Sequence, residues 1–289
     1  PPRSTLSSSS AASDVYKRQL GRTSDGNYYE KLNYAVGETH EPGSTFKLMA
    51  MVVALEDKVI DTSTIVDTEK GLIKIYGRSV RDSHRGGYGK ISAARAFEVS
   101  SNVGLVKLIY ENYKEQPQKF IDGLNRMHLN EPLGLAIKGE GKPYIPAPGD
   151  KKWSGLSLPW MAYGYGSIQI TPLQTLTFYN AIANNGEMVK PRFIKEVKEL
   201  NKTVEKFEKK VIDPQICSPE TVAKVKEMMK NVVERGTGVG LYEPHFSMAG
   251  KTGTAQTEYW MKDWAQNRRY ISSFVGFFPV EKPKYSCIV

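Results

Sequence analysis

The sequence has only two cysteines, Cys217 and Cys287, among its 289 residues. Two cysteines exclude the disulfide framework of a small secreted domain, and nothing around them decides whether they are free or paired. No stretch approaches the ~18 continuous apolar residues of a transmembrane helix, and no signal peptide is visible. With 40% hydrophobic and 25% charged residues, the chain has the balance of a globular protein with a sizeable core.

Signatures of metal, nucleotide and nucleic-acid sites are also missing. Zinc-finger spacing is absent, and Gly164 and Gly166 do not continue into a dinucleotide fingerprint. Gly250-Lys251-Thr252 ends like a phosphate loop, but that loop needs glycine where the chain has His245. The net charge is +9, yet lysines and glutamates interleave through residues 195–210, as on a solvated hairpin. We therefore expect no metal, no cofactor and no nucleic-acid partner.

The chain divides into a short leader and one larger domain. Residues 1–19 begin with Pro-Pro and contain a serine run, which is typical of low complexity without a core. We expect this leader to be non-native or low-complexity sequence, and residues 20–289 to form the folded domain. Periodicity and breakers predict its elements. Helices are expected over 44–57, 92–97, 103–110, 116–127, 171–185 and 218–236. Strands are expected over 70–76, 246–254, 270–278 and 285–289, with a hairpin over 189–211. Loops are expected over 20–39, 82–89, 130–157, 236–240 and 260–268.

The stretch Glu41 to Ala50 carries the first chemical signal. Pro42 and Gly43 break the chain, and apolar residues at three- and four-residue spacing then predict a helix with one buried face. Ser44 lies at its N-terminus and Lys47 one turn later, so a hydroxyl and an amine lie side by side. Ser-x-x-Lys also occurs by chance, as an N-cap serine followed by an exposed lysine.

This pair suits the chemistry of an acylation centre. A serine hydroxyl is a poor nucleophile until a base takes its proton. A lysine can be that base when burial and a second cation both favour its neutral amine. The first turn of a helix also points free N–H groups at a developing oxyanion.

Two later stretches complete a pattern. Ser100-Ser101-Asn102 lies between two helical segments, where short polar side chains can project into a cleft. Lys251-Thr252-Gly253-Thr254 follows in a strand-like run. The order Ser-x-x-Lys, Ser-x-Asn, Lys-Thr-Gly is the motif set of penicillin-binding proteins and class A β-lactamases. The 151 residues from Ser100 to Lys251 are long for a β-lactamase and resemble the larger transpeptidases.

From residue 20 to 289 the chain resembles the transpeptidase domain of a class B penicillin-binding protein of the FtsI type. Further motifs carry the resemblance: Glu41-Pro42-Gly43, Gly164-Tyr165-Gly166 with Thr171-Pro172-Leu173-Gln174, and residues 250–256. The resemblance implies an α/β (α+β) fold, in which an antiparallel sheet flanked by helices lies beside a mostly helical lobe. The site lies between the two.

The resemblance also implies roles for the motif residues. Ser44 would attack the D-Ala–D-Ala peptide of a donor stem, Lys47 would be the base, and Ser100 would relay a proton to the leaving group. Backbone N–H groups of Ser44 and Thr254 would form the oxyanion hole. The remaining motif residues would bind substrate: Asn102 through the acyl side chain's amide, Lys251 through its charge, and Thr252 and Thr254 at the carboxylate. Gly253, between these two threonines, is also expected to contact substrate.

The partners implied are peptidoglycan stem peptides of lipid II-derived strands, β-lactam antibiotics, and other division or cell-wall synthesis proteins. The parent protein would work at the periplasmic face of the bacterial cell membrane, held by an N-terminal anchor. Compared with the family, a strand pair before Glu41 and a C-terminal helix are missing, so we expect a fragment truncated at both ends.

Two alternatives share the same motifs. The first is a β-lactam-hydrolysing enzyme or a β-lactam sensor. A hydrolase needs a base that activates water for deacylation, and no carboxylate lies at a spacing from the motifs that would assign it this role. The second is a non-catalytic cell-wall scaffold module, which has no need of all five motif side chains. His84, in the loop 82–89, is of a residue type that often acts as a base, but the sequence indicates no partner for it. We therefore expect it to be an ordinary polar loop residue.

Overall fold

The computed structural model describes residues 20–30, 32–257 and 269–289. The predicted leader at 1–19 lies outside the described residues, as does the whole of the polar loop predicted at 260–268. Within the described ranges, no helix combines the length and the apolar character that a membrane span requires.

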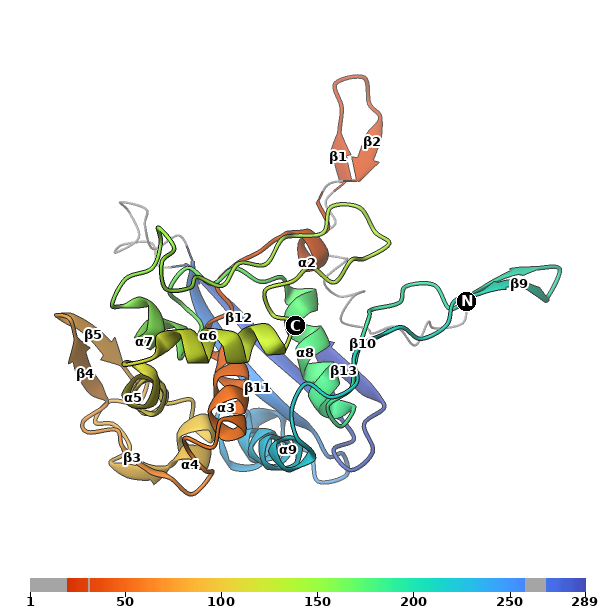
Figure 1. The fold of residues 1–289 in the computed structure, drawn as a ribbon. Coiled ribbons are helices and arrows are strands. Elements are labelled where there is room, and N and C mark those ends of the chain that lie inside the picture. Colours follow the sequence, from red (N-terminus) through yellow and green to blue (C-terminus); the bar gives the residue numbers. More distant parts are fainter. Residues whose placement is uncertain (1–19, 31, 258–268) are drawn as a thin grey trace.

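The main sheet has three antiparallel strands in the order β11-β12-β13. Its strands are β11 (Ala249–Thr257), β12 (Arg269–Phe278) and β13 (Tyr285–Ile288). Two helices pack on it: α9 (Pro219–Arg235) against β11, and α8 (Pro172–Ala183) against β12 and β13 (Figure 1). The predicted antiparallel sheet flanked by helices is confirmed.

A mostly helical lobe lies beside this sheet (Figure 1). Its helices are α4 (Ala93–Glu98), α5 (Asn102–Tyr113), α6 (Pro117–Arg126) and α7 (Ser157–Met161). Two small antiparallel pairs join them: β3 (Ile65–Asp67) with β6 (Lys90–Ser92), and β4 (Leu72–Ile75) with β5 (Arg78–Arg81). Ser92 and Ser101 accept backbone hydrogen bonds at the starts of α4 and α5, which is why these helices begin where they do.

The helix predicted over residues 44–57 is built in two parts. A 3₁₀ turn, η1 (Gly43–Phe46), comes first, and α3 (Lys47–Glu56) continues from it. The prediction of one buried face is wrong, because every residue from 47 to 55 is buried. Helices α5, α6 and α9 surround α3. Since all residues from Leu48 to Leu55 are apolar, the helix can be buried on all sides.

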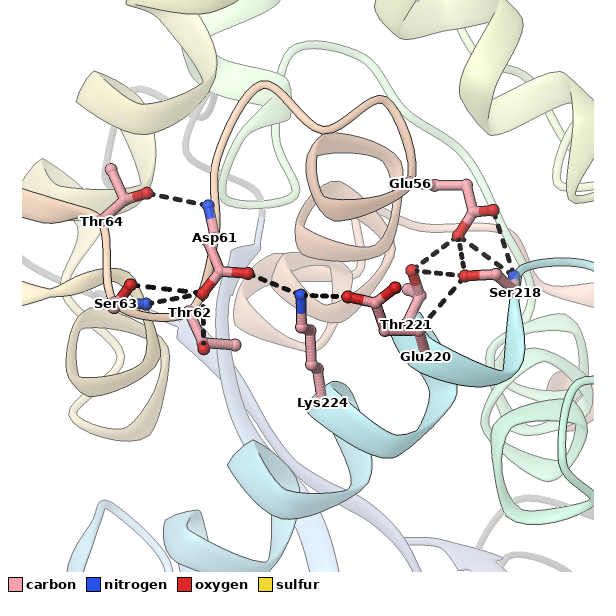
Figure 2. A network of polar contacts seen from close by, with 9 residues as sticks. All are labelled: Glu56, Asp61, Thr62, Ser63, Thr64, Ser218, Glu220, Thr221 and Lys224. Carbon is pink, nitrogen blue, oxygen red and sulfur yellow. Dashed lines mark hydrogen bonds and ion pairs between the residues drawn. The ribbon is translucent and has the colours of Figure 1, made fainter.

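A polar network joins the end of α3 to the start of α9 (Figure 2). The Glu56 carboxylate accepts hydrogen bonds from the Ser218 N–H at 3.1 Å and from the Thr221 hydroxyl at 2.6 Å. The Lys224 amine lies between Asp61 at 2.5 Å and Glu220 at 2.8 Å. Helices α3 and α9 are thus fixed to each other at this end.

Two hairpins project from the body (Figure 1). The predicted hairpin over 189–211 is confirmed as β8 (Glu196–Glu199) and β9 (Lys202–Lys206), with β7 (Met188–Val189) and β10 (Val211–Asp213) paired at its base. The loop predicted at 20–39 is wrong in part. It contains β1 (Leu20–Arg22), β2 (Tyr28–Glu30) and the short helix α2 (Tyr34–Gly37). Asp25-Gly26 is the turn signal there, with Gly26 at a φ of +90°.

Candidate active site

The 3₁₀ turn η1 presents Ser44 and Lys47 from one side. A 3₁₀ helix has three residues per turn, so residues three apart lie directly in line. The Lys47 N–H donates to the Ser44 carbonyl and closes the turn. Ser44 is partly exposed whereas Lys47 is fully buried. The nucleophile candidate is therefore accessible, and the base candidate is shielded from water.

The backbone of this turn is held by the segment around Gly164. The Gly43 N–H donates to the Gly164 carbonyl at 3.1 Å. Gly164 has a φ of +87°, and a Cβ at this position would overlap the Gly43 carbonyl. Only glycine fits here, so the glycines around Tyr165 serve a close backbone approach.

The Ser100 turn connects α4 to α5, as predicted. Ser100 has a φ of +56°, a left-handed conformation that is unusual for a residue with a Cβ. Asp82 holds the turn from outside. Its carboxylate accepts from the Ser101 hydroxyl at 2.9 Å and from the Val103 N–H at 2.9 Å. These bonds set where the Ser100 side chain points.

The buried amine of Lys47 reaches this turn. Among the described residues its hydrogen bonds run to the Ser100 carbonyl at 2.7 Å, the Ser100 Oγ at 3.0 Å and the Asn102 Oδ1 at 2.7 Å, rather than to the Ser44 hydroxyl. A neutral amine has two N–H groups and one lone pair. The two pure acceptors, the Ser100 carbonyl and Asn102 Oδ1, take up both N–H groups, so the lone pair is left for a hydroxyl proton.

Lys251 approaches the same hydroxyl from β11. Its amine lies 2.9 Å from the Ser100 Oγ and donates to the Thr252 carbonyl at 3.0 Å. It is fully buried and lies 5.7 Å from the centre of the Phe97 ring. One side chain from each of the three motifs therefore meets at a single oxygen atom.

Burial changes the acidity of both amines, and repulsion from Lys251 adds to the effect at Lys47. Burial, and then the charge of Lys251, hold the pKa of Lys47 well below its usual value, while Asp82 opposes this shift. Burial lowers the pKa of Lys251 to about 7. The site can thus hold a neutral Lys47 beside a charged Lys251 near neutral pH, as the sequence led us to expect.

The other predicted residues line the same region. The Asn102 amide donates to the Arg81 carbonyl at 2.7 Å, and this leaves it one further N–H. Along β11, Thr252 and Thr254 are partly or fully exposed, whereas Gly253 is buried. A Cβ on Gly253 would lie 2.8 Å from the Thr45 methyl, so its absence lets β11 approach the serine turn.

Comparison with known proteins identifies the family. The family described as "Penicillin binding protein transpeptidase domain" matches residues 6–289. The chain belongs to this family. The match begins inside the predicted leader 1–19, so the domain boundary at residue 20 stays a prediction.

Relatives of this penicillin-binding domain come from several bacteria. PbpB of Mycolicibacterium smegmatis is 30% identical over 275 residues, covering 93% of this chain and 41% of the relative. Stage V sporulation protein D of Bacillus subtilis is 29% identical, covering 87% and 38%. FtsI of Escherichia coli is 27% identical, covering 89% and 40%. The chain spans about two fifths of the length of these relatives, and the predicted resemblance to the FtsI-type transpeptidases is confirmed.

Solved structures agree with the fold. The D,D-transpeptidase domain of a peptidoglycan glycosyltransferase from Eggerthella lenta has a TM-score of 0.77 at 27% identity, covering 89% of this chain and 61% of that one. Penicillin-binding protein 3 of Mycobacterium tuberculosis without ligand has a TM-score of 0.74 at 28% identity, covering 92% and 58%.

Several contacts at this site link residues that the sequence did not pair. Asp82 holds the Ser100 turn, and the Thr237 hydroxyl lies 2.6 Å from that of Thr252. The loop 236–240, predicted to be flexible, is anchored because the Thr237 N–H donates to the Glu98 carbonyl at 3.1 Å. The Tyr165 hydroxyl accepts from the Gln256 N–H at 2.8 Å, next to Thr254. Their partners are distant in sequence, so spacing could not reveal them.

Three remaining residues, His84, Cys217 and Cys287, take no part in the hydrogen bonds described for this site. His84 Nδ1 donates a hydrogen bond to the Gly87 carbonyl at 3.0 Å and its ring stacks on Tyr88, so it is a polar loop residue as predicted. Cys217 and Cys287 are both free. In the part of the chain that the structure describes, no group of three acidic, histidine or cysteine side chains is arranged to hold a metal ion.

Proposed function

We propose that this chain is the catalytic domain of a serine-type D,D-transpeptidase that cross-links peptidoglycan stem peptides. The observation that carries the proposal is the Ser100 hydroxyl, which lies 3.0 Å from the Lys47 amine and 2.9 Å from the Lys251 amine. A scaffold has no need to bury two lysines on one serine, since burying charge is unfavourable.

The first half-reaction is acylation of Ser44. Its hydroxyl proton passes to the lone pair of Lys47 while Oγ bonds to the carbonyl carbon of the donor's penultimate D-Ala. Backbone N–H groups of Ser44 and Thr254 stabilise the oxyanion. The C–N bond to the last D-Ala then breaks, Ser100 passes its proton to the leaving amine, and Lys47 returns to Ser100 the proton that it took from Ser44. Once protonated, Lys47 donates to the Ser100 oxygen as Lys251 does, so the Ser100 O–H is free for this transfer.

The second half-reaction releases Ser44. The amine of a second stem attacks the acyl carbon and gives a proton to the neutral Lys47. A new amide bond forms, the bond between the acyl carbon and Ser44 Oγ breaks, and the Ser44 oxygen takes that proton from Lys47. During acylation, Lys251, Thr252 and Thr254 hold the carboxylate of the last D-Ala, with Gly253 leaving room between them. Asn102 uses its remaining N–H on the donor's amide.

The names of the relatives support this reaction and its setting. FtsI of Escherichia coli is named a peptidoglycan D,D-transpeptidase, and penicillin-binding protein 3 of Mycobacterium tuberculosis has been solved with ampicillin. We accordingly propose lipid II-derived strands as substrate, β-lactams as inhibitors that acylate Ser44, and other cell-wall synthesis proteins as partners. The domain would act at the periplasmic face of the bacterial cell membrane.

Covalent labelling tests the proposal. The purified chain and its Ser44→Ala variant are incubated with a fluorescent penicillin and separated under denaturing conditions, and circular dichroism confirms that each is folded. We expect a labelled band from the parent chain and none from the variant. A folded parent chain that takes no label would contradict the role of Ser44.

The lifetime of the label separates a transpeptidase from a β-lactam hydrolase. A transpeptidase lacks a base that activates water for deacylation, so its penicilloyl-enzyme persists. Turnover of penicillin within seconds would favour the hydrolase instead. The lifetime is measured by chasing the labelled chain with unlabelled penicillin.

A further inference from the structure

A buried tyrosine supports the serine turn from behind. Tyr179, in α8, is fully buried, and its hydroxyl donates a 2.8 Å hydrogen bond to the carbonyl of Thr45, the residue after Ser44. The reaction proposed above makes no use of this group. We propose that Tyr179, acting through Thr45, is a positioning residue that holds η1 in the 3₁₀ form required for acylation. This inference rests on the proposed role of Ser44 as nucleophile.

The Thr45 carbonyl lies outside the α-helical hydrogen bonds of α3. Phe46 is the N-cap of α3, and the N-cap carbonyl is the first to accept an α-helical hydrogen bond. The Thr45 carbonyl therefore lies just before the α-helical ladder, in a residue that is 2% exposed. A buried carbonyl without a donor is unfavourable, and the Tyr179 hydroxyl supplies one.

The conformation of the turn decides how Ser44 and Lys47 face each other. In a 3₁₀ turn, residues three apart lie in line. If the α-helix began one turn earlier, the same two residues would be rotated by about 60° relative to each other, because an α-helix has 3.6 residues per turn. By bonding to the carbonyl between these residues, Tyr179 favours the aligned form.

Thr45 also connects the turn to β11. Its hydroxyl donates to the Pro42 carbonyl at 2.8 Å, and its methyl packs against Gly253. Gly253 is two residues from Lys251 on the same strand. The carbonyl that Tyr179 holds therefore belongs to the residue that sets the spacing between the serine turn and the strand carrying the second lysine.

Tyr113 provides a matched control at the other end of α3. It is 1% exposed, and its hydroxyl donates to the carboxylate of Asp57, the C-cap of α3, at 2.9 Å. Tyrosine-to-phenylalanine replacement removes one buried hydroxyl in each case. Only Tyr179 bonds to the turn that bears Ser44.

The experiment compares Tyr179→Phe with Tyr113→Phe in the full chain, with Ser44→Ala as the blank. Time courses at saturating fluorescent penicillin give a first-order acylation constant and a final labelled fraction. We expect Tyr179→Phe to lower the constant about tenfold, because small misplacements of reacting groups slow reactions strongly. The final labelled fraction should equal that of the parent. Tyr113→Phe should keep the parent constant.

Three results would overturn the inference: an unchanged constant in Tyr179→Phe, an equal loss in both variants, or a lower final fraction with an unchanged constant. The last is the signature of a purely structural role. A parent chain that takes no label would instead contradict the proposed function.

A second variant keeps the inference testable if Tyr179→Phe does not fold. Thr45→Ser removes only the methyl that packs on Gly253 and keeps both hydrogen bonds of Thr45. We expect its acylation constant to fall by about threefold, because the serine turn then loses part of its contact with β11. An unchanged acylation constant would show that the contact between Thr45 and β11 does not position the serine turn.

Discussion

The N-terminal end of α3 lies where two buried lysine amines meet, whereas its C-terminal end lies where carboxylates meet a lysine and hydroxyls. The Lys47 amine and the Lys251 amine meet at the Ser100 hydroxyl, and both lysines are fully buried. Nine residues further along, the Glu56 carboxylate accepts from Ser218 and Thr221 (Figure 2). The first arrangement lowers the pKa of both amines, and the second is electrostatically favourable.

The contrast indicates that the N-terminal end of α3 serves the chemistry of the site and the C-terminal end serves stability. Unfavourable electrostatics concentrate where chemistry requires a neutral amine beside a charged one. The opposite end uses ordinary capping and ion pairs to fix α3 against α9. Substitutions at the two ends should therefore separate activity from stability.

Replacement of the buried base should have the largest effect. Lys47→Met should lower the acylation rate constant by about 10³, because positioned general bases contribute roughly 10²–10⁴. The melting temperature at pH 7 should stay equal or rise, because a buried amine with a lowered pKa disfavours the folded state. Rates come from penicillin labelling and stability from thermal unfolding. Lys224→Met, the matched lysine near the other end of α3, should keep the parent rate.

The pH dependence should reveal Lys251. Its ammonium group attracts the substrate carboxylate, and burial lowers its pKa to about 7. The acylation rate should therefore fall as the pH rises above about 7, by up to tenfold per pH unit, since the charged fraction falls in that proportion. A rate that stays flat between about pH 7 and 9 would show that the charge of Lys251 is not required.

The same shift predicts an opposite trend in stability. Between about pH 7 and the ordinary lysine value of about 10.4, the unfolded chain binds more protons than the folded one. Unfolding free energy should then rise with pH over this window while the acylation rate falls. Thermal unfolding across the window checks this sign.

Breaking the polar network at the C-terminal end of α3 should lower stability without changing activity. Its effect should be the smallest of the changes considered. Glu56→Ala leaves the Ser218 N–H and the Thr221 hydroxyl without their acceptor. Unfolding free energy should fall by about 1–2 kcal/mol, which is typical for loss of a helix cap. The acylation constant of the folded chain should stay at the parent value. A slower constant at full labelling would mean that this end also positions Lys47.

The sequence alone predicted much of this molecule where the signals are local. Thr171, Pro172 and Gln174 form a capping box at the start of α8, and Ser218 caps α9. The three motifs gave Lys47, Ser100, Asn102 and Lys251, which the structure brings into hydrogen-bond contact. A motif order can be read without knowing the fold because each motif is only three or four residues long.

The parts that were missed depend on tertiary contacts. Tyr179 and Thr45 are 134 residues apart, and Asp82 and Ser101 are 19 apart. No local sequence pattern reveals the hydrogen-bond partner of a tyrosine in an apolar helix or of an aspartate in a polar loop. The burial of α3 on all sides was missed for the same reason, because the spacing of apolar residues indicates one buried face. It does not show that three helices, α5, α6 and α9, pack around α3. The 3₁₀ start of the helix follows from packing against Gly164 and Tyr179 rather than from local propensity.

The β8–β9 hairpin offers a point of attachment for experiments. Leu200 and Asn201 form its tip, Leu200 is 93% exposed, and the hairpin projects away from the sheet and helices (Figure 1). Exposed tips of this kind are the sites where proteins accept inserted sequence. A peptide tag or a dye placed between Leu200 and Asn201 would tether the domain to a surface. Single molecules held in this way would report each acylation event while the serine turn stays free of the linker.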